Sequence, residues 1–316
     1  MKINKQNIKK SIKEFLPDRV IELIWILRGI PPYFNAIYKD RKTVYHPLSF
    51  YDDEETVNLI VNEHKSLCRF GDGELAWMCG ANLDSFQKSS PKLAKALLDA
   101  YESTDEKLLI GLPIGIQDSR KCKLAVKMHW RVIKADFYKK LNELPKIERI
   151  YANASITRPY IDYKDRKYSE RQFNNLKRIW NGRNILIVEG EKTKLGIGND
   201  LFNNSNSIRR IICPAENAFE KISLIEEAIR IHARKTDLIL VALGPTATVL
   251  AAKLCGENFQ VIDIGHVDIE YMWFLKYSIL RDPIDGKYVN ESGVKDTSSK
   301  YDNDENYLST IIQKVF

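Results

Sequence analysis

From about residue 44 the chain alternates short apolar segments with longer segments in which apolar residues recur every three or four positions. The short apolar runs predict strands at 66–70, 108–114, 184–188, 208–213, 237–243 and 260–264. The longer periodic segments predict helices at 91–101, 121–142, 219–234 and 247–254. Unbroken Val, Ile and Leu strands separated by helices indicate a buried sheet. The predicted fold class is therefore α/β, with a mostly parallel sheet flanked by helices.

The two ends of the chain have different patterns. Residues 281–306 are rich in Asp, Asn and Ser and predict a polar loop, and residues 307–316 predict a short amphipathic helix. Residues 1–43 predict a basic helical arm, in which apolar residues lie between lysines and a denser apolar block ends near Pro31 and Pro32. The sequence therefore predicts three parts, at 1–43, 44–280 and 281–316.

The net charge of +7 is concentrated in the arm. Residues 1–42 hold ten Lys and Arg against four Asp and Glu, which leaves +6, and the other 274 residues hold 39 against 38, which leaves +1. A nearly neutral body argues against nucleic acid as a partner. A basic amphipathic helix that contains Phe15 and Trp25 can lie on an anionic membrane surface. The alternative is that the arm packs on the body or on a second subunit of a homo-oligomer.

Composition sets the class and compartment. At 316 residues with 44% hydrophobic residues, the chain can bury a full core. We find no uninterrupted apolar run close to the ~20 residues that span a bilayer, and no secretory signal at the start. Five scattered cysteines without CxxC spacing argue against a disulfide framework. We expect a cytoplasmic protein, peripheral at the inner membrane face if the arm binds lipid.

The segment Arg69-Phe70-Gly71-Asp72-Gly73-Glu74 follows a predicted strand. In an extended backbone, residues two apart point to the same side, so Asp72 and Glu74 would converge on one cation. Carboxylate oxygens suit Mg²⁺ or Mn²⁺, which usually complete their shell with substrate phosphates. The alternative is an acidic surface turn that binds nothing.

Other loops after predicted strands carry groups that can bind a nucleotide. Gly196 and Gly198 would expose backbone N–H groups, Thr246 would begin a helix, and Asn217 could bind a base or ribose. Arg158 lies among small hydroxyl residues and suits bidentate phosphate contact. Each has a plain alternative: a glycine turn, a capped helix without ligand, a hydrogen bond within the loop, and a surface salt bridge.

The segment 263–271 contains a histidine between acids. His266, Asp268 and Glu270 share parity, so an extended backbone would aim all three the same way, and in a helix His266 and Glu270 would lie one turn apart. A histidine with acidic neighbours at a strand end can act as a general base or a metal ligand. A structural histidine is the alternative.

Six segments in this order resemble the bacterial GT-D-type glycosyltransferases. They are RFGDGE at 69–74, NASITRPY at 153–160, VEGEKTKLGIGNDLF at 188–202, CPAENAF at 213–219, ALGPTATVLA at 242–251 and DIGHVDIEY at 263–271. The resemblance covers about residues 60–280, and neither the arm nor the tail at 281–316 maps onto it. It implies a Rossmann-like fold, a nucleotide-sugar donor that is commonly a UDP-sugar, and a DxE metal motif at Asp72 and Glu74.

The resemblance also implies a nucleotide pocket and an acceptor. The residues expected at the nucleotide are Arg69, Arg158, Gly190, Gly196, Gly198, Asp200, Asn217 and Thr246. The acceptor would be a glycan, lipid-linked or protein-linked, in bacterial surface polysaccharide or glycoprotein synthesis. Mn²⁺ or Mg²⁺ would neutralise the diphosphate leaving group, and a general base would assist the acceptor hydroxyl. For that base we favour Asp268, and then His266 or Glu270.

Two other functional classes remain open at this point. A metal-dependent nucleotide or nucleotide-sugar hydrolase, or a phosphotransferase, would use the same carboxylates and phosphate loops. A non-catalytic nucleotide-binding or membrane-docking module would keep its function after loss of Asp72 and Glu74.

Overall fold

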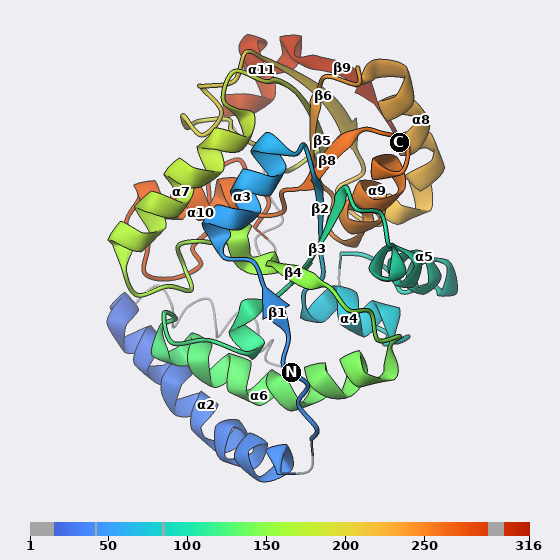
Figure 1. Ribbon diagram of the computed structural model, residues 1–316. Helices are drawn as coiled ribbons and strands as arrows, with labels where there is room; N and C mark the ends of the chain where they lie inside the picture. The colour runs from blue at the N-terminus through green and yellow to red at the C-terminus, as the bar shows by residue number, and fades with distance from the viewer. Residues whose placement is uncertain (1–15, 42, 84–85, 290–299) are drawn as a thin grey trace, which may run out of the picture.

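The computed structural model describes residues 16–41, 43–83, 86–289 and 300–316. Within them the chain builds a parallel sheet with the strand order β1-β4-β3-β2-β8-β7-β5-β6-β9 (Figure 1). The strands are β1 (Ser49–Phe50), β2 (Ser66–Arg69), β3 (Leu108–Leu112), β4 (Ile150–Asn153), β5 (Asn184–Gly190), β6 (Ser207–Cys213), β7 (Leu238–Ala242), β8 (Gln260–Asp263) and β9 (Ile311–Lys314). The α/β fold class and the parallel sheet are confirmed.

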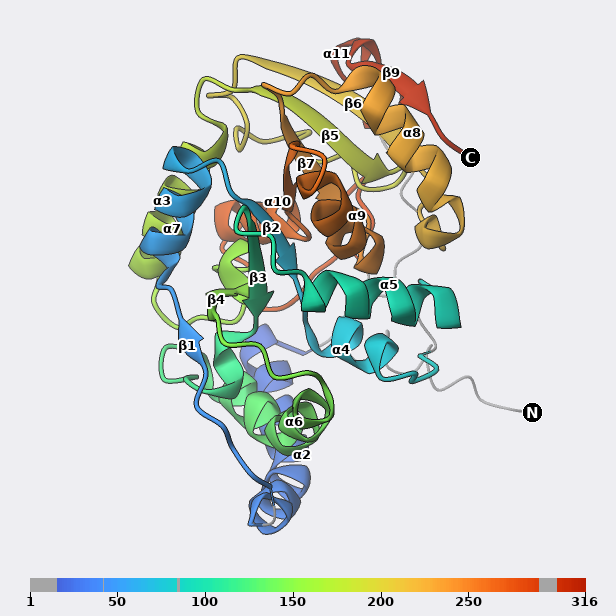
Figure 2. The same cartoon turned by 45° about the vertical axis from the view of Figure 1, so that its right-hand side comes forward.

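Helices cover both faces of this sheet (Figure 2). One face carries α3 (Asp53–Asn62), α7 (Arg166–Trp180) and α10 (Val267–Leu275). The other carries α4 (Asp72–Met78), α5 (Pro91–Glu102), α8 (Ile222–His232) and α9 (Pro245–Cys255). Strands such as β7 are buried on both sides, because parallel strands covered by helices expose neither face to water. Short 3₁₀ helices, among them η1 (Ile114–Ile116), η2 (Ala154–Thr157), η3 (Ala218–Lys221) and η5 (Lys300–Asn303), join the larger elements.

A helix pair lies beyond the sheet. The helix α2 (Asp18–Asp40) packs along α6 (Leu124–Glu143), and the two approach closely where a Cβ on Gly29 would lie 3.1 Å from Met128 Cε. The helix α2 continues through Pro31 and Pro32, where the denser apolar block of the sequence ends. By length and composition alone, Asp18–Tyr38 is long and apolar enough to cross a membrane. Core helices of soluble proteins and signal sequences near an N-terminus meet the same two criteria.

The tail differs from its expected structure. Instead of one helix over 307–316, the chain forms α11 (Glu305–Ser309) and then β9, which adds to the edge of the sheet beside β6. The β-branched pair Ile311 and Ile312 suits a strand. Pairing there also satisfies backbone groups, because the Arg210 N–H donates to Thr310 O at 2.7 Å. The polar loop expected over 281–306 includes residues 290–299, which lie outside the described residues.

The order of the strands in the sheet indicates where a functional site is expected. After β2 the chain moves to β3 and β4 on one side, and the strands from β5 to β8 fill the other side, so the direction of winding reverses between β2 and β8. In open parallel sheets, ligands bind beyond the carboxyl ends of the strands at such a reversal. Arg69 ends β2 and Asp263 ends β8, so the expected site is beside these two residues.

Candidate functional site

A cleft of about 840 Å³ opens at this place. Its inner wall consists of the residues that follow β2, β4, β5, β6, β7 and β8, and its outer wall consists of α2 and α6. Of the residues predicted from the sequence, those that line the cleft are Arg69, Asp72, Glu74, Arg158, Gly190, Asn217, His266 and Asp268. Gly196, Gly198, Asp200, Thr246 and Glu270 lie outside its lining. A nucleotide role for any of them stays a prediction.

Arg69 joins three segments at the base of the cleft. Its Nε donates to the carbonyl of Asp263 at 2.8 Å, its Nη2 to Asp263 Oδ1 at 2.8 Å, and its Nη1 to Ala154 O at 3.0 Å. Thr248 Oγ1 donates to the other carboxylate oxygen, Oδ2, of Asp263 at 3.1 Å. Arg69 therefore positions the ends of β2, β8 and β4 through its own contacts. The sequence analysis did not select Asp263, although an acid at the end of a buried strand was a usable signal.

The backbone expected at Asp72 and Glu74 is wrong. These residues begin α4 rather than extend β2, and residues two apart on a helix point about 200° apart. Glu74 Oε2 accepts a hydrogen bond from the Gly71 N–H at 2.9 Å, which is one half of a capping box. Burial, together with the charge of Asp263, raises the pKa of Glu74 to about 7.

The metal assignment therefore needs a different geometry from the one expected. Within the described ranges, no group of three or more His, Cys, Asp and Glu side chains is placed to hold a metal ion. Mg²⁺ is often bound by only one or two carboxylates together with substrate phosphates. Asp72 is exposed and lines the cleft, and Glu74 lines it as well, so each can offer carboxylate oxygen to a metal ion that substrate phosphates also bind.

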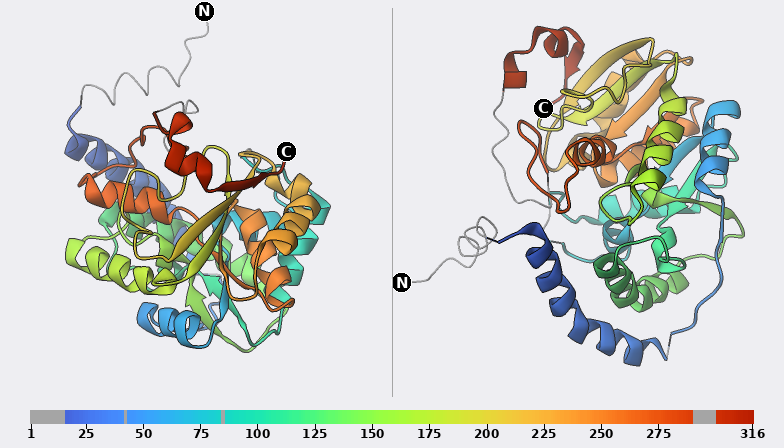
Figure 3. Two further views of the ribbon diagram at one scale, coloured as in Figure 1. Left: turned by 90° about the horizontal axis from the view of Figure 1, so that it is seen from above. Right: turned by 90° about the vertical axis from the view of Figure 1, so that its left-hand side faces the viewer.

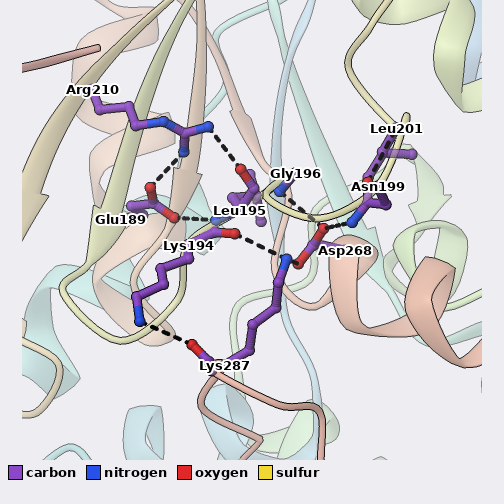
Figure 4. Close-up of polar contacts among 10 residues, drawn as sticks. Glu189, Lys194, Leu195, Gly196, Asn199, Leu201, Arg210, Asp268 and Lys287 are labelled. Atoms are coloured by element: carbon purple, nitrogen blue, oxygen red, sulfur yellow. Dashed lines mark hydrogen bonds and ion pairs between the residues drawn. The ribbon is translucent and has the colours of Figure 1, made fainter. Parts of the chain in front are cut away.

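Asp268 holds a loop in place (Figure 4). It lies in the first turn of α10, not on an extended strand, and is buried. Its Oδ1 accepts from the Gly196 N–H at 2.9 Å and from Asn199 Nδ2 at 2.7 Å, and its Oδ2 pairs with the buried Lys287 ammonium. The Gly196 N–H is thus directed at a carboxylate of the protein, whereas the sequence analysis directed it at a diphosphate. Lys287 also donates to Lys194 O at 3.0 Å and was not foreseen.

A second buried pair supports the same loop. Arg210 Nη1 donates to Glu189 Oε1 at 2.6 Å, and Glu189 Oε2 accepts from the Leu195 N–H at 2.6 Å. Lys194 Nζ lies 2.6 Å from Asp302 Oδ1. The segment after β5 is therefore fixed by α10, β6 and the C-terminal part of the chain together.

Two predicted nucleotide residues have structural partners. Asn217 Oδ1 accepts from the Lys88 N–H at 2.8 Å, a contact with a different loop from its own. Asp200 accepts from Tyr271 Oη at 2.8 Å and from Lys177 Nζ at 3.0 Å. Burial alone would raise the pKa of Asp200, but these hydrogen bonds outweigh it and lower the pKa.

Glu270 is buried beneath the cleft wall. Its Oε2 accepts from the N–H groups of Tyr160 and Ile161 at 3.0 and 2.9 Å, and its Oε1 lies 3.5 Å from Arg158 Nε. Burial raises the pKa of Glu270 to about 7, although Arg158 acts in the opposite direction. Glu270 therefore connects Arg158 to α10, and its contacts are with protein groups.

This raised pKa predicts a pH-dependent stability. The pKa of Glu270 is about 7 in the folded protein and about 4.3 in an unfolded chain. The bound proton therefore stabilises the fold fully below pH ~4, and this stabilisation is lost as the pH rises to 7. Wild type should therefore lose stability relative to Glu270→Gln between pH 5 and pH 8, by about 1–3 kcal/mol at roughly 1.4 kcal/mol per pKa unit. Urea unfolding at a series of pH values measures this difference, and parallel curves for the two proteins would contradict the assignment.

The sequence of this chain is similar to a glycosyltransferase family and to two streptococcal proteins. The family model described as "Glycosyltransferase GT-D fold" matches residues 67–292. "Glycosyltransferase GlyD" of Streptococcus pneumoniae serotype 4 is 35% identical over 266 residues, which are 83% of this chain and 32% of that protein. "Probable glycosyl transferase Gly" of Streptococcus gordonii is 35% identical over 272 residues, 85% of this chain and 39% of that protein. The chain thus spans between about a third and two-fifths of the length of these relatives.

Solved structures agree in fold. A structure titled "A New Glycosyltransferase (DUF1792) from Streptococcus sanguinis" superposes with a TM-score of 0.79 at 32% identity, over 85% of this chain and all of that one. A second, titled "The highly conserved domain of unknown function 1792 has a distinct glycosyltransferase fold", gives 0.77 at 33% identity, over 85% of this chain and 96% of that one. The chain belongs to the family of glycosyltransferases with the GT-D fold.

Proposed function

We propose that this chain transfers a sugar from a nucleotide-sugar donor, a UDP-sugar, to a glycan acceptor on lipid or protein, with Mn²⁺ or Mg²⁺ as cofactor. One observation carries the proposal: the acids at the start of α4 and Arg158 line one cleft at the winding reversal of the sheet. An anionic diphosphate needs both kinds of group, a cationic side chain and acids that can share a divalent ion with it.

In this proposal the residues that line the cleft have separate roles. Arg158 contacts the phosphates, and Arg69 keeps the ends of β2 and β8 at a fixed spacing through its bonds to Asp263. Asp72 and Glu74 would hold the metal ion, which when bound supplies electrostatic stabilisation of the diphosphate leaving group. His266 lies in the cleft immediately before α10, and we assign proton uptake from the acceptor to it, since both carboxylate oxygens of Asp268 already have partners.

Metal-dependent donor binding is the test of this proposal. A UDP-sugar with Mn²⁺ should raise the thermal unfolding temperature of the wild type, because a ligand of the folded state stabilises it by mass action. Asp72→Asn and Glu74→Gln should each lose this shift. Glu63→Gln, at an acid on the surface beside Lys65, is the matched control and should keep it. Equal shifts in all four proteins would reject the metal assignment.

The same protein separates the transferase from a hydrolase. A transferase releases UDP slowly from the donor alone and faster when an acceptor is added, whereas a hydrolase or phosphotransferase releases its product without a sugar acceptor. A chain that binds the donor and never releases UDP would instead be a binding module. UDP release with and without a panel of acceptor sugars therefore decides among the three classes.

Arg158 offers a second measurement on donor binding. Arg158→Ala should weaken it by about 1.5–3 kcal/mol, the range for a hydrogen bond to a charged group. The change is best made in a Glu270→Gln background, so that no buried carboxylate loses its cationic neighbour. Arg120→Ala, at an exposed arginine paired with Asp118, serves as control. Unchanged affinity after Arg158→Ala would move the phosphate site elsewhere.

We also propose a cytoplasmic location at the inner face of a membrane. All five cysteines are described and free, as expected in a reducing compartment. The arm at 1–42 supplies the basic charge that an anionic leaflet attracts.

A further inference from the structure

The outer wall of the cleft differs chemically from its inner wall. Trp25, Gly29 and Pro32 of α2 line it, at a spacing that places them on one face of the helix. Met128 and Trp130 of α6 lie on the same side of the cleft. Most of this outer wall is apolar or aromatic, and its polar members are Glu22 of α2 and His129 of α6. The strand ends opposite carry Arg158 and several acids. The cleft therefore has an apolar end for a second substrate beside the polar end for a donor.

The helix α2 lies at the outside of the molecule (Figure 3), and the face of α2 turned away from the cleft is also apolar. It carries an outer stripe of large side chains at three- and four-residue steps, with relative exposures between 39 and 69%: Val20, Leu23, Leu27, Ile30, Phe34 and Tyr38. This spacing is that of one continuous helical face. Soluble surfaces rarely expose so long an apolar strip without a partner.

The charge of the adjoining segment indicates what that partner is. Residues 1–17, which precede α2 in the sequence, contain five lysines and one glutamate. An apolar helix face next to a lysine-rich segment matches an anionic lipid surface, where burial and attraction act together. A second copy of the chain would instead bring two arms of +6 together, which repel each other.

We propose that the outer stripe lies on an anionic membrane and that the apolar end of the cleft, between α2 and α6, receives a saccharide carried on a membrane-bound lipid. This rests on the proposed transferase function for the reaction itself. Because α2 presents one face to the membrane and the opposite face to the cleft, a lipid-linked acceptor reaches the donor along this helix. The helix α2 lies outside the family match at 67–292, whereas α6 lies inside it.

Vesicle binding tests the outer stripe without any donor. The full chain should sediment with phosphatidylglycerol vesicles at low salt and be released at high salt, and should ignore phosphatidylcholine vesicles. Leu27→Gln combined with Phe34→Gln should lower the pelleted fraction at least about tenfold. The matched control is Leu224→Gln with Ile231→Gln, which removes two equally exposed side chains from α8 and should bind as wild type. Circular dichroism and thermal unfolding check that both variants fold.

Soluble glycosides test the apolar end of the cleft. Octyl glucoside below its critical micelle concentration should change tryptophan fluorescence at about tenfold or more lower concentration than glucose, because burying even two methylene groups gives such a gain. Trp25→Phe should reduce this change, and Trp77 and Trp130, which also line the cleft, would account for what remains.

Each outcome is decisive. Equal vesicle binding by the stripe variant and its control, no binding by any form, or equal response to glucose and octyl glucoside would overturn the proposal. A wild-type dimer in analytical ultracentrifugation that becomes a monomer in the stripe variant would identify a second copy as the partner instead. Neither measurement needs glycosyl transfer, so the proposal can fail while the transferase function stands.

Discussion

Replacing Asp268 with asparagine is expected to lower the free energy of unfolding by about 3–5 kcal/mol, the usual cost of removing one partner of a buried ion pair. Lys287 is buried, and its ammonium would then face the uncharged amide of the variant in place of a carboxylate. The loop at Gly196 would also lose the charge on its acceptor. Urea unfolding of wild type and variant at pH 7 measures the loss. A variant as stable as wild type would show that the pair contributes nothing to folding.

A double variant separates folding from chemistry. Asp268→Asn with Lys287→Met removes both charges, and replacing a whole buried pair is often close to neutral, so more than half of the lost stability should return. Turnover measured in this folded variant then reports on the reaction step. Turnover near wild type agrees with proton uptake by His266. A low turnover rate with unchanged donor affinity would instead identify Asp268 as the general base, as the sequence alone predicted.

The sheet was predictable because its strands are buried on both faces. Residues 238–241 of β7 and 185–188 of β5 stand out as unbroken Val, Ile and Leu runs, since helices cover them on each side. The edge strands β1 and β9 are short and less apolar, and their pairing partners lie about 100 residues away in sequence. No local pattern specifies such a partner, so β1 was missed and the tail was assigned to a helix. The inner strand β4 (Ile150–Asn153), whose four residues include Tyr and Asn, was missed as well.

The site was predicted by residue type more accurately than by geometry. Asp72, Glu74, His266 and Asp268 do line one cleft. The first pair was placed on an extended backbone, and for the second pair an extended backbone and a helix were both left open. Both segments are helix starts, where acids in the first turn are favoured by the helix dipole. A Glu three residues after the cap was the local signal for α4. The same short sequence can form a strand, with its acids on one side, or the first turn of a helix. Only the packing of the surrounding structure decides between the two.

The side chains that pair with these acids could not be predicted from the sequence. Lys287 lies in a polar segment with no strand or helix pattern, and it reaches Asp268 only because the chain returns beside α10. Such a contact depends on the tertiary fold alone. The arm was recognised as basic and amphipathic, but its position as a wall of the cleft follows from the packing of α2 on α6.

Gly265 gives the second large expected effect. Its φ of +49° lies in the left-handed region, and an added Cβ would stand 1.9 Å from Arg69 Nη2. The end of an arginine usually moves aside, but this guanidinium is held by three hydrogen bonds to Asp263 and Ala154. Gly265→Ala should therefore cost about 2.5–5 kcal/mol of stability, from about 1–2 kcal/mol of backbone strain and about 1.5–3 kcal/mol for a lost charge-assisted hydrogen bond.

The matched control for this change is Gly256→Ala. Gly256 has a helical backbone, and its added Cβ would meet nothing closer than Lys253 O at 3.5 Å, so this variant should stay within about 1 kcal/mol of wild type. Urea unfolding of the three proteins gives the stabilities, and thermal shift with a UDP-sugar and Mn²⁺ reports the cleft. Because Arg69 spaces the ends of β2 and β8, Gly265→Ala should weaken donor binding even where the variant is fully folded. A stable Gly265→Ala protein with wild-type donor affinity would show that Arg69 yields freely and does not set the shape of the cleft.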